Sequence, residues 1–173
     1  MTQADDLGRV VIPKEIRRTM RIREGDPLEI YTTREGEVIF KKYSLIGGLE
    51  DFAAQFCDVL NRSSGFTAAV TDRDAIIAIT GSGKRELLGK PLSDALAQVM
   101  EQRSIYQYQG SGRPLPVSDS SDRYTVAVAA PILCEGDVLG LVLFLSSDAQ
   151  IPGEGEYKLA QTVSAFLGRH MET

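Results

Sequence analysis

The stretch DDLGRVVIPKEIRRTMRI, residues 5–22, decides how the first part of the chain is interpreted. Its spacing of apolar and polar side chains predicts a short strand over 8–12 and a helix over 14–20. Pro13 separates the two, because proline removes a backbone donor yet is tolerated where a helix begins. The stretch therefore predicts a strand, a break and a short helix in quick succession.

A β-hairpin is predicted immediately after this stretch. Residues 27–33 and 38–43 alternate apolar and polar side chains, and the turn-forming segment 34–37 joins them. The whole unit up to Tyr43 contains only a handful of large apolar side chains. Because so small a domain leaves most of its surface in water, we expect it to dimerise.

The predicted helix carries a face of positive charge. Its basic residues stand at i, i+3, i+4 and i+7 and share one face: Lys14, Arg17, Arg18 and Arg21. Ile16 and Met20 lie opposite, and Arg9 adds a fifth charge from the preceding strand. Several cations on one rigid element can displace the counterions of a single phosphate backbone together. The pattern predicts a nucleic-acid contact, with an ordinary solvated face as the alternative.

Composition places this basic segment inside an acidic protein. The chain has 173 residues, 43% of them hydrophobic and 25% charged, with a net charge of −5. Residues 1–43 carry nine Lys or Arg against eight Asp or Glu, whereas residues 44–173 carry ten against sixteen. No apolar run has the length of a membrane span and the first ten residues are polar. We therefore expect a cytoplasmic protein that does not contact a membrane.

A second domain is predicted after the glycine-containing segment 44–48, with the boundary placed between residues 46 and 47. Helical spacing recurs over 49–60, 93–103 and 154–170, with Ser93 as an N-cap. Four segments have the composition of strands: 66–71, 75–80, 124–133 and 138–146. Residues 110–123 are polar and are predicted to form a loop. The order predicts an α+β domain, an antiparallel sheet with helices on one face.

The sequence offers little for catalysis. Gly81-Ser82-Gly83-Lys84 resembles the end of a phosphate-binding loop, but Ala78 and Arg85 replace the glycine and the hydroxyl residue that such a loop needs, which predicts a plain turn. Acidic pairs such as Asp5 with Asp6 and Asp72 with Asp74 are typical of turns.

Metal and cofactor sites are not expected either. Cys57 and Cys134 lie in separate apolar segments, and His170, the single histidine, lies three residues from the chain end, so no soft metal-ligand cluster can form. We predict no catalytic residues, no metal and no cofactor. Tyr106, Tyr108 and Arg113, which flank the polar loop, are where a sensor domain of this layout would hold a small ligand.

The motifs LGRVVIPKEIRR, GDPLEI and the closing KKY cover nearly all of residues 5–43 and closely resemble the AbrB-type swapped-hairpin DNA-binding domain. In length and order of elements, the remaining 130 residues look like a GAF domain. The pair of modules resembles the family of stage V sporulation protein T-like transcription regulators. The resemblance implies an AbrB-like domain over 1–46 and a GAF-like sensor and oligomerisation domain over 47–173.

This resemblance also implies a mode of action. In such proteins the N-terminal chains interlock in pairs to form a swapped-hairpin β-barrel that presents arginines to double-stranded DNA. The DNA-contacting positions fall on Arg9, Arg17 and Arg18, with weaker support for Lys14 and Arg21. The implied function is regulation of sporulation or transition-state genes at the nucleoid. One departure stands out: the family has a further arginine-bearing strand before this motif, where the sequence has only Met1 to Ala4, and we expect that the recorded start is shortened.

The sequence therefore predicts a homo-oligomeric DNA-binding regulator. The helices over 49–60 and 154–170 are expected to join dimers into a tetramer, and the GAF-like domain to bind an unidentified small effector. Two alternatives are weighed against it. An AbrB-like antitoxin that binds a toxin would be favoured by an extended acidic tail, and a nucleotide-binding enzyme would require a complete phosphate-binding loop.

Overall fold

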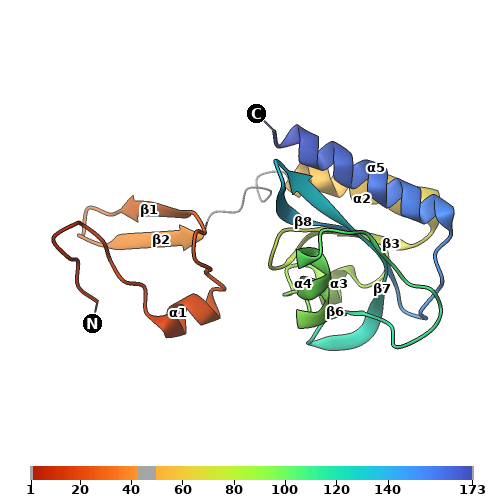
Figure 1. Ribbon diagram of the computed structural model, residues 1–173, viewed down its shortest axis with the longest axis horizontal. Helices are drawn as coiled ribbons and strands as arrows, with labels where there is room; N and C mark the ends of the chain where they lie inside the picture. Colours follow the sequence, from red (N-terminus) through yellow and green to blue (C-terminus); the bar gives the residue numbers. More distant parts are fainter. Residues whose placement is uncertain (1, 43–49, 173) are drawn as a thin grey trace. The chain divides into compact units, whose positions relative to one another are not determined.

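A computed structural model describes residues 2–42 and 50–172 of the chain, with the side chains of Glu50 and Asp51 left out. The chain divides into an N-terminal unit, Met1–Ser44, and a C-terminal unit, Leu45–Thr173 (Figure 1). The predicted domain boundary between residues 46 and 47 falls outside the described residues. Each unit is therefore described by itself.

The N-terminal unit consists of one short helix and one hairpin. Helix α1 is Lys14–Thr19, and strands β1 (Leu28–Thr32) and β2 (Val38–Lys42) pair antiparallel from Leu28 opposite Lys42 to Thr32 opposite Val38. The hairpin predicted from the alternating pattern is confirmed.

The strand predicted over 8–12 is wrong for the single chain. Val10 forms only an isolated antiparallel bridge with Ala4, and the Thr2 hydroxyl donates to the Val11 carbonyl at 3.1 Å. A strand needs a neighbour for its backbone groups. Within residues 2–42, the single bridge is all the strand pairing that this segment has.

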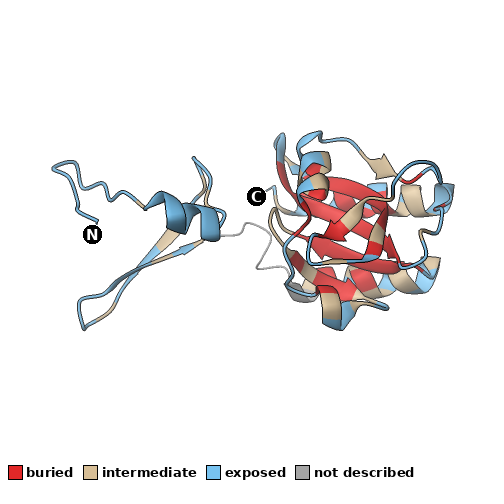
Figure 2. Cartoon of the chain, turned by 90° about the horizontal axis from the view of Figure 1, so that it is seen from below, coloured by how far each residue is buried: buried red, intermediate tan, exposed pale blue. Residues whose placement is uncertain are grey.

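The N-terminal unit has no buried residue among those described, 2–42 (Figure 2). Its exposed large apolar side chains are Leu7, Val10, Val11, Ile16, Met20, Ile30, Tyr31, Val38 and Ile39. The hydrophobic effect stabilises a fold only in proportion to the apolar area removed from water. The isolated unit therefore lacks the burial that an independent fold needs.

The C-terminal unit is built on one antiparallel sheet in the order β4-β3-β8-β7-β5, with β6 also paired to β7. Its strands are β3 (Thr67–Thr71), β4 (Ile76–Thr80), β5 (Tyr106–Gln107), β6 (Pro116–Ser118), β7 (Ser121–Cys134) and β8 (Asp137–Ser146). Its helices are α2 (Glu50–Ser64), α3 (Lys84–Leu87), α4 (Asp94–Glu101) and α5 (Glu154–His170). The predicted α+β class and antiparallel sheet are confirmed.

Helices cover both faces of this sheet, so the predicted one-sided arrangement is wrong. On one face, α2 and α5 pack against alternate strand residues such as Val142 and Phe144. On the other, Leu87 of α3 and Leu96 of α4 pack against Leu143 and its alternate neighbours. Successive strand residues point to opposite faces, and β3 and β8 are buried at nearly every position. Strands that are buried on both faces of the sheet need other elements packed against both faces.

The polar segment 110–123 is not wholly the loop that was predicted. It contains β6 and the first residues of β7, with Pro116 opposite Thr125 and Ser118 opposite Ser121. The predicted cap is confirmed: the Ser93 hydroxyl accepts from the Leu96 amide at 3.0 Å. None of the helices in the described parts of the chain combines the length and the apolar character of a membrane span.

Candidate nucleic-acid interface

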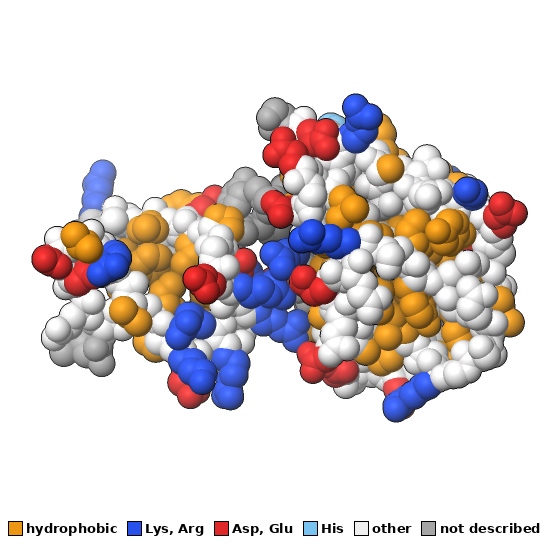
Figure 3. All heavy atoms as spheres, in the orientation of Figure 1, with side chains coloured by type: hydrophobic (Ala, Val, Ile, Leu, Met, Phe, Trp, Pro, Cys, Tyr) orange, Lys and Arg blue, Asp and Glu red, His pale blue; other side chains and the backbone are white. Residues whose placement is uncertain are grey.

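Helix α1 displays the predicted cations to solvent. It begins after Pro13, and Lys14, Arg17 and Arg18 are all exposed. Arg18 lies 3.6 Å from Glu15 in an ion pair whose side chains are 79% and 86% exposed, so solvent weakens the attraction. Within residues 2–42 and 50–172, no carboxylate lies within ion-pair distance of Lys14 or Arg17. Figure 3 shows the Lys and Arg side chains gathered around this helix.

Arg21 does not belong to the helical face on which the sequence placed it. Its φ is +53°, outside the helix, and two hydrogen bonds end α1 just before it: Ile22 N–H to the Arg17 carbonyl at 2.8 Å and Arg21 N–H to the Arg18 carbonyl at 3.3 Å. This pair of bonds is the Schellman pattern, which usually has glycine at the left-handed position. The Lys42 ammonium donates to the Arg21 carbonyl at 2.8 Å. Arg21 thus lies in a turn beside the helix.

Arg9 is held by a tight loop that starts at Asp5. The guanidinium Nε donates to Asp5 Oδ2 at 2.7 Å, and Nη2 lies 2.7 Å from the same oxygen. The other oxygen, Oδ1, accepts from the backbone N–H groups of Arg9 at 2.9 Å and Leu7 at 3.0 Å. The backbone N–H of Arg9, followed by its side chain, lowers the pKa of the Asp5 carboxyl below its ordinary value. Asp5 therefore stays ionised at neutral pH.

Asp5 is the residue of this surface that sequence reasoning missed. The sequence predicted a turn residue there, and the structure confirms the turn. Asp72 is likewise a turn residue: its Oδ1 accepts from the Asp74 and Ala75 amides at 2.8 Å. The overlooked signal was the spacing of Asp5 and Arg9, four residues apart around Gly8. Gly8 has a φ of +77°, and this lets the loop close.

The glycine-containing segment 81–84 forms the predicted turn over 81–83, and α3 begins at Lys84. The Thr67 hydroxyl donates to the Ser82 carbonyl at 3.0 Å, and a Cβ on Gly83 would lie 2.7 Å from the Tyr124 ring. The turn packs against β3 and β7, and this packing explains its glycine.

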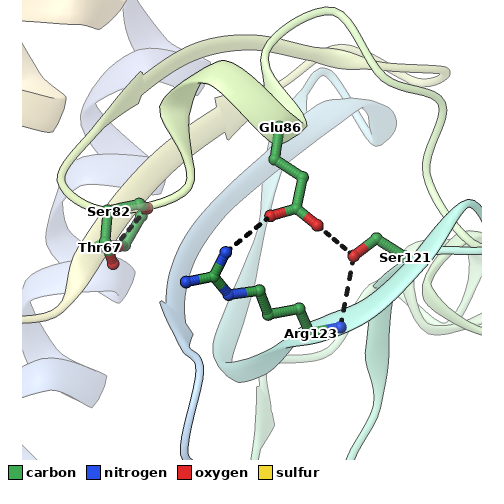
Figure 4. A network of polar contacts seen from close by, with 5 residues as sticks. All are labelled: Thr67, Ser82, Glu86, Ser121 and Arg123. Atoms are coloured by element: carbon green, nitrogen blue, oxygen red, sulfur yellow. Dashed lines mark hydrogen bonds and ion pairs between the residues drawn. The ribbon is translucent and has the colours of Figure 1, made fainter.

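A polar network lies next to this turn. Ser121 donates to a carboxylate oxygen of Glu86, and Arg123 lies 3.8 Å from the other (Figure 4). The Arg123 guanidinium also lies over the Tyr124 ring, 5.5 Å from its centre. These contacts connect α3 to the start of β7.

The three residues proposed for a ligand site are not joined in the described residues. Tyr106 is half-buried on β5, and burial, followed by the neighbouring Tyr108, raises the pKa of its hydroxyl. Tyr108 is buried, whereas Arg113 is exposed, and no hydrogen bond or ion pair in the described chain links Arg113 to either tyrosine. The ligand site expected around these three residues stays a prediction.

His170 is part of an aromatic cluster. Its ring stacks on Phe52 at 5.1 Å and on Phe166 at 6.1 Å between ring centres. In the part of the chain that the structure describes, no three His, Cys, Asp or Glu side chains form a group that could hold a metal. Cys57 and Cys134 are free thiols.

The comparisons with known proteins agree with this division of the chain. A family model described as stage V sporulation protein T C-terminal, transcription factor, matches residues 48–172. The chain belongs to the stage V sporulation protein T family. Stage V sporulation protein T of Bacillus subtilis (strain 168) is 48% identical over 171 residues, covering 97% of this chain and 94% of that protein. As a member of the stage V sporulation protein T family, the chain is a sporulation transcription regulator.

Its N-terminal unit has relatives of its own. A family model described as antidote-toxin recognition MazE, bacterial antitoxin, matches residues 1–45. The transition state regulatory protein AbrB of Bacillus subtilis (strain 168) is 58% identical over 41 residues, covering 24% of this chain and 42% of that protein. The predicted AbrB-type domain is confirmed.

The C-terminal unit has the predicted GAF-like fold. The GAF domain/HD domain protein from Geobacter sulfurreducens superposes with a TM-score of 0.52 at 18% identity, covering 75% of this chain and 98% of that one. At this identity the similarity concerns the fold alone. This member of the stage V sporulation protein T family therefore joins an AbrB-type unit to a GAF-like one.

Proposed function

We propose that this regulator binds double-stranded DNA through Arg9, Arg17 and Arg18, with Lys14 beside them and Arg21 contributing from its turn. The observation that carries the proposal is the exposure of all five cations within one short segment of an acidic protein. Phosphate contacts need positive groups that stay accessible and are held on ordered backbone. Helix α1 and the Asp5–Arg9 loop supply that backbone.

The DNA-binding form is proposed to be a dimer of N-terminal units. Residues 2–42 contain no buried side chain, and apolar residues such as Ile30 and Val38 stay exposed on the hairpin. Interlocking two chains would bury these side chains, complete the pairing of the segment around Val10 and place two basic surfaces on one duplex. A doubled set of cations also raises the number of phosphates contacted at once.

A second self-association surface is proposed on α2 and α5. Phe52, Phe56 and Phe166 lie together there, with ring centres 5.1 Å apart for Phe52 and Phe56 and 5.4 Å apart for Phe56 and Phe166. Phe166 is 48% exposed although it belongs to the apolar stripe of its helix, and Val59 of α2 is exposed as well. Covering this patch with a second copy would join dimers into a tetramer. A small effector that favours one packing of these helices could then alter DNA binding, provided that its affinity differs between the two states.

Neither alternative function has comparable support. The antitoxin-type match covers only the N-terminal unit, and a folded sheet follows where a toxin-binding tail would be extended. A nucleotide-processing enzyme would need the cradle that the packed turn at Gly83 does not provide. We propose a regulator without enzymatic activity, acting on the nucleoid in the cytoplasm.

Fluorescence anisotropy with a labelled DNA duplex tests this proposal. We expect the full chain to bind, R17A or R18A to weaken binding by about tenfold or more, and R9A to weaken it as well, since each substitution removes charge-assisted hydrogen bonds to phosphate. K90A is the matched control, because Lys90 is an exposed cation in the C-terminal unit. Equal affinities for K90A and the three arginine variants would overturn the proposal.

A further inference from the structure

Asp5 joins both the side chain and the backbone of Arg9. Asp5 Oδ2 lies 2.7 Å from both Nε and Nη2 of the Arg9 guanidinium. Asp5 Oδ1 accepts a hydrogen bond from the Arg9 backbone N–H at 2.9 Å. The chain also closes on itself here, because Asp5 N–H donates to the Arg9 carbonyl at 3.0 Å and Gly8 N–H to the Asp5 carbonyl at 3.1 Å. One carboxylate thus determines both the loop geometry and the direction of the arginine.

The guanidinium keeps free donors in this arrangement. Arginine has five N–H donors in a planar fork. Asp5 engages Nε and one N–H of Nη2, which leaves the other Nη2 N–H and one Nη1 N–H side by side on the distal edge, and the second Nη1 N–H beside them. The Arg9 side chain is 72% exposed. A fork edge of this kind can form two parallel hydrogen bonds to a phosphate or to a guanine.

We propose that Asp5 is a positioning residue for DNA binding: it holds the Arg9 guanidinium by one edge so that the other edge faces the duplex. This inference rests on the proposed function, in which Arg9 contacts DNA. A free arginine side chain loses much rotamer freedom when it binds, and a side chain already fixed loses less. The carboxylate therefore improves binding although it carries the charge of the DNA itself.

The direction of the change in DNA affinity on removing the Asp5 charge tests this inference. Removing a carboxylate from a surface that faces phosphates ordinarily strengthens binding. Positioning predicts the opposite for D5N, which keeps the size of the side chain but removes the charge that holds the guanidinium. Asp6 offers a matched control, since it is an exposed neighbour and its D6N variant changes the net charge equally.

The experiment compares the full chain with D5N, D6N, R9A and the double variant D5N/R9A by anisotropy at one salt concentration. We expect D5N to bind about threefold more weakly or worse, D6N to bind as tightly as the parent or more tightly, and D5N to have no further effect in the R9A background. The double variant separates positioning from folding, because a D5N chain with a damaged N-terminal unit would also bind more weakly without Arg9.

Three outcomes would overturn the inference: D5N binding as tightly as the parent, D5N binding more tightly, or D5N weakening binding equally with and without Arg9. The proposed function fails by a different result. If R9A, R17A and R18A all bind as the parent does, the DNA-contacting role is wrong. If they bind weakly while D5N does not, only the positioning role of Asp5 is wrong.

Discussion

Gly168 of α5 lies directly against the carbonyl oxygen of Leu133 in β7: a Cβ built on Gly168 would be 2.1 Å from that oxygen. No side chain can occupy that space without moving the helix or the strand. The contact is made on the face of the sheet that α2 and α5 cover, with Leu167 buried beside it. Gly168 therefore sets how closely the last helix approaches the sheet.

G168A should destabilise the C-terminal unit by about 1–3 kcal/mol, because the added methyl group forces α5 away from β7. Gly155 provides the control in the same helix, since a Cβ there would meet nothing within 4 Å. G155A should be neutral or stabilise the unit by up to about 1 kcal/mol through helix propensity. Urea unfolding of both variants measures the two free energies. Equal effects would show that the close approach of helix and strand does not matter.

Arg21 supplies a second test of backbone conformation. Its φ of +53° strains any residue with a Cβ, so R21G should be more stable than R21A by about 1 kcal/mol. Both variants lack the guanidinium, and the difference between them isolates the backbone. Thermal unfolding of the N-terminal unit within the full chain gives the comparison. R21A as stable as R21G would contradict the turn that ends α1.

The aromatic patch of Phe52, Phe56 and Phe166 predicts a change in assembly. F166E should reduce the proposed tetramer to a dimer, because a carboxylate would be buried without a partner in the proposed interface. A165E places the same charge on the adjacent exposed position of α5 and should leave the tetramer intact. Sedimentation equilibrium gives the molar masses. An unchanged mass for F166E would remove this surface from the assembly.

The two thiols should differ sharply in reactivity. Cys57 is fully buried in α2, and burial raises its pKa to about 12, so about one molecule in ten thousand carries the reactive thiolate at pH 8. Cys134 is half-buried, and although its pKa is raised as well, its sulfur is more accessible. Iodoacetamide should alkylate Cys134 first and Cys57 only after unfolding in guanidinium, as mass spectrometry would show. The C134S variant should then stay unmodified in its native state. Alkylation of native C134S would contradict the burial of Cys57.

Much of the fold could be predicted from periodicity. The segment 154–170 was predicted from its apolar spacing, and α5 has the same bounds. The Ser93 cap and the hairpin of β1 and β2 follow from local chemistry, because a hydroxyl before a helix and alternating residues around a turn act over a few residues.

Other features depend on contacts that no local pattern encodes. Strand β6 was not predicted because the segment around Ser118 and Ser121 is polar and has the composition of a loop. Ser118 of β6 pairs with Ser121 of β7, and this pairing depends on the geometry of the hairpin that joins the two strands. The helix over 93–103 was predicted, but its place on the second face of the sheet was not. The other apolar residues on that face, such as Leu87 and Leu92, lie in a one-turn helix and in the short segment before α4, which have no helical periodicity.

Some features of the candidate nucleic-acid interface could be predicted from the sequence and others could not. Helical spacing predicted that Arg17 and Arg18 share one face of the helix, and both are exposed. The predicted helix over 14–20 already ended before Arg21, but the left-handed turn at Arg21 could not be predicted, because its two backbone hydrogen bonds form without the glycine that usually marks them. The pairing of Asp5 with Arg9 was not predicted, although their spacing of four residues around Gly8 is visible in the sequence.

The salt dependence of DNA affinity measures whether Arg17 and Arg18 contact the phosphate backbone. Kd of the full chain and of the R17A/R18A double variant would be measured on one duplex at several salt concentrations. We expect log affinity to fall steeply with log salt for the parent, and the slope for the variant to be smaller by about 1 for each phosphate that the variant no longer neutralises. Two parallel lines would mean that these arginines do not contact the DNA backbone, and the proposed DNA-binding role of α1 would be wrong.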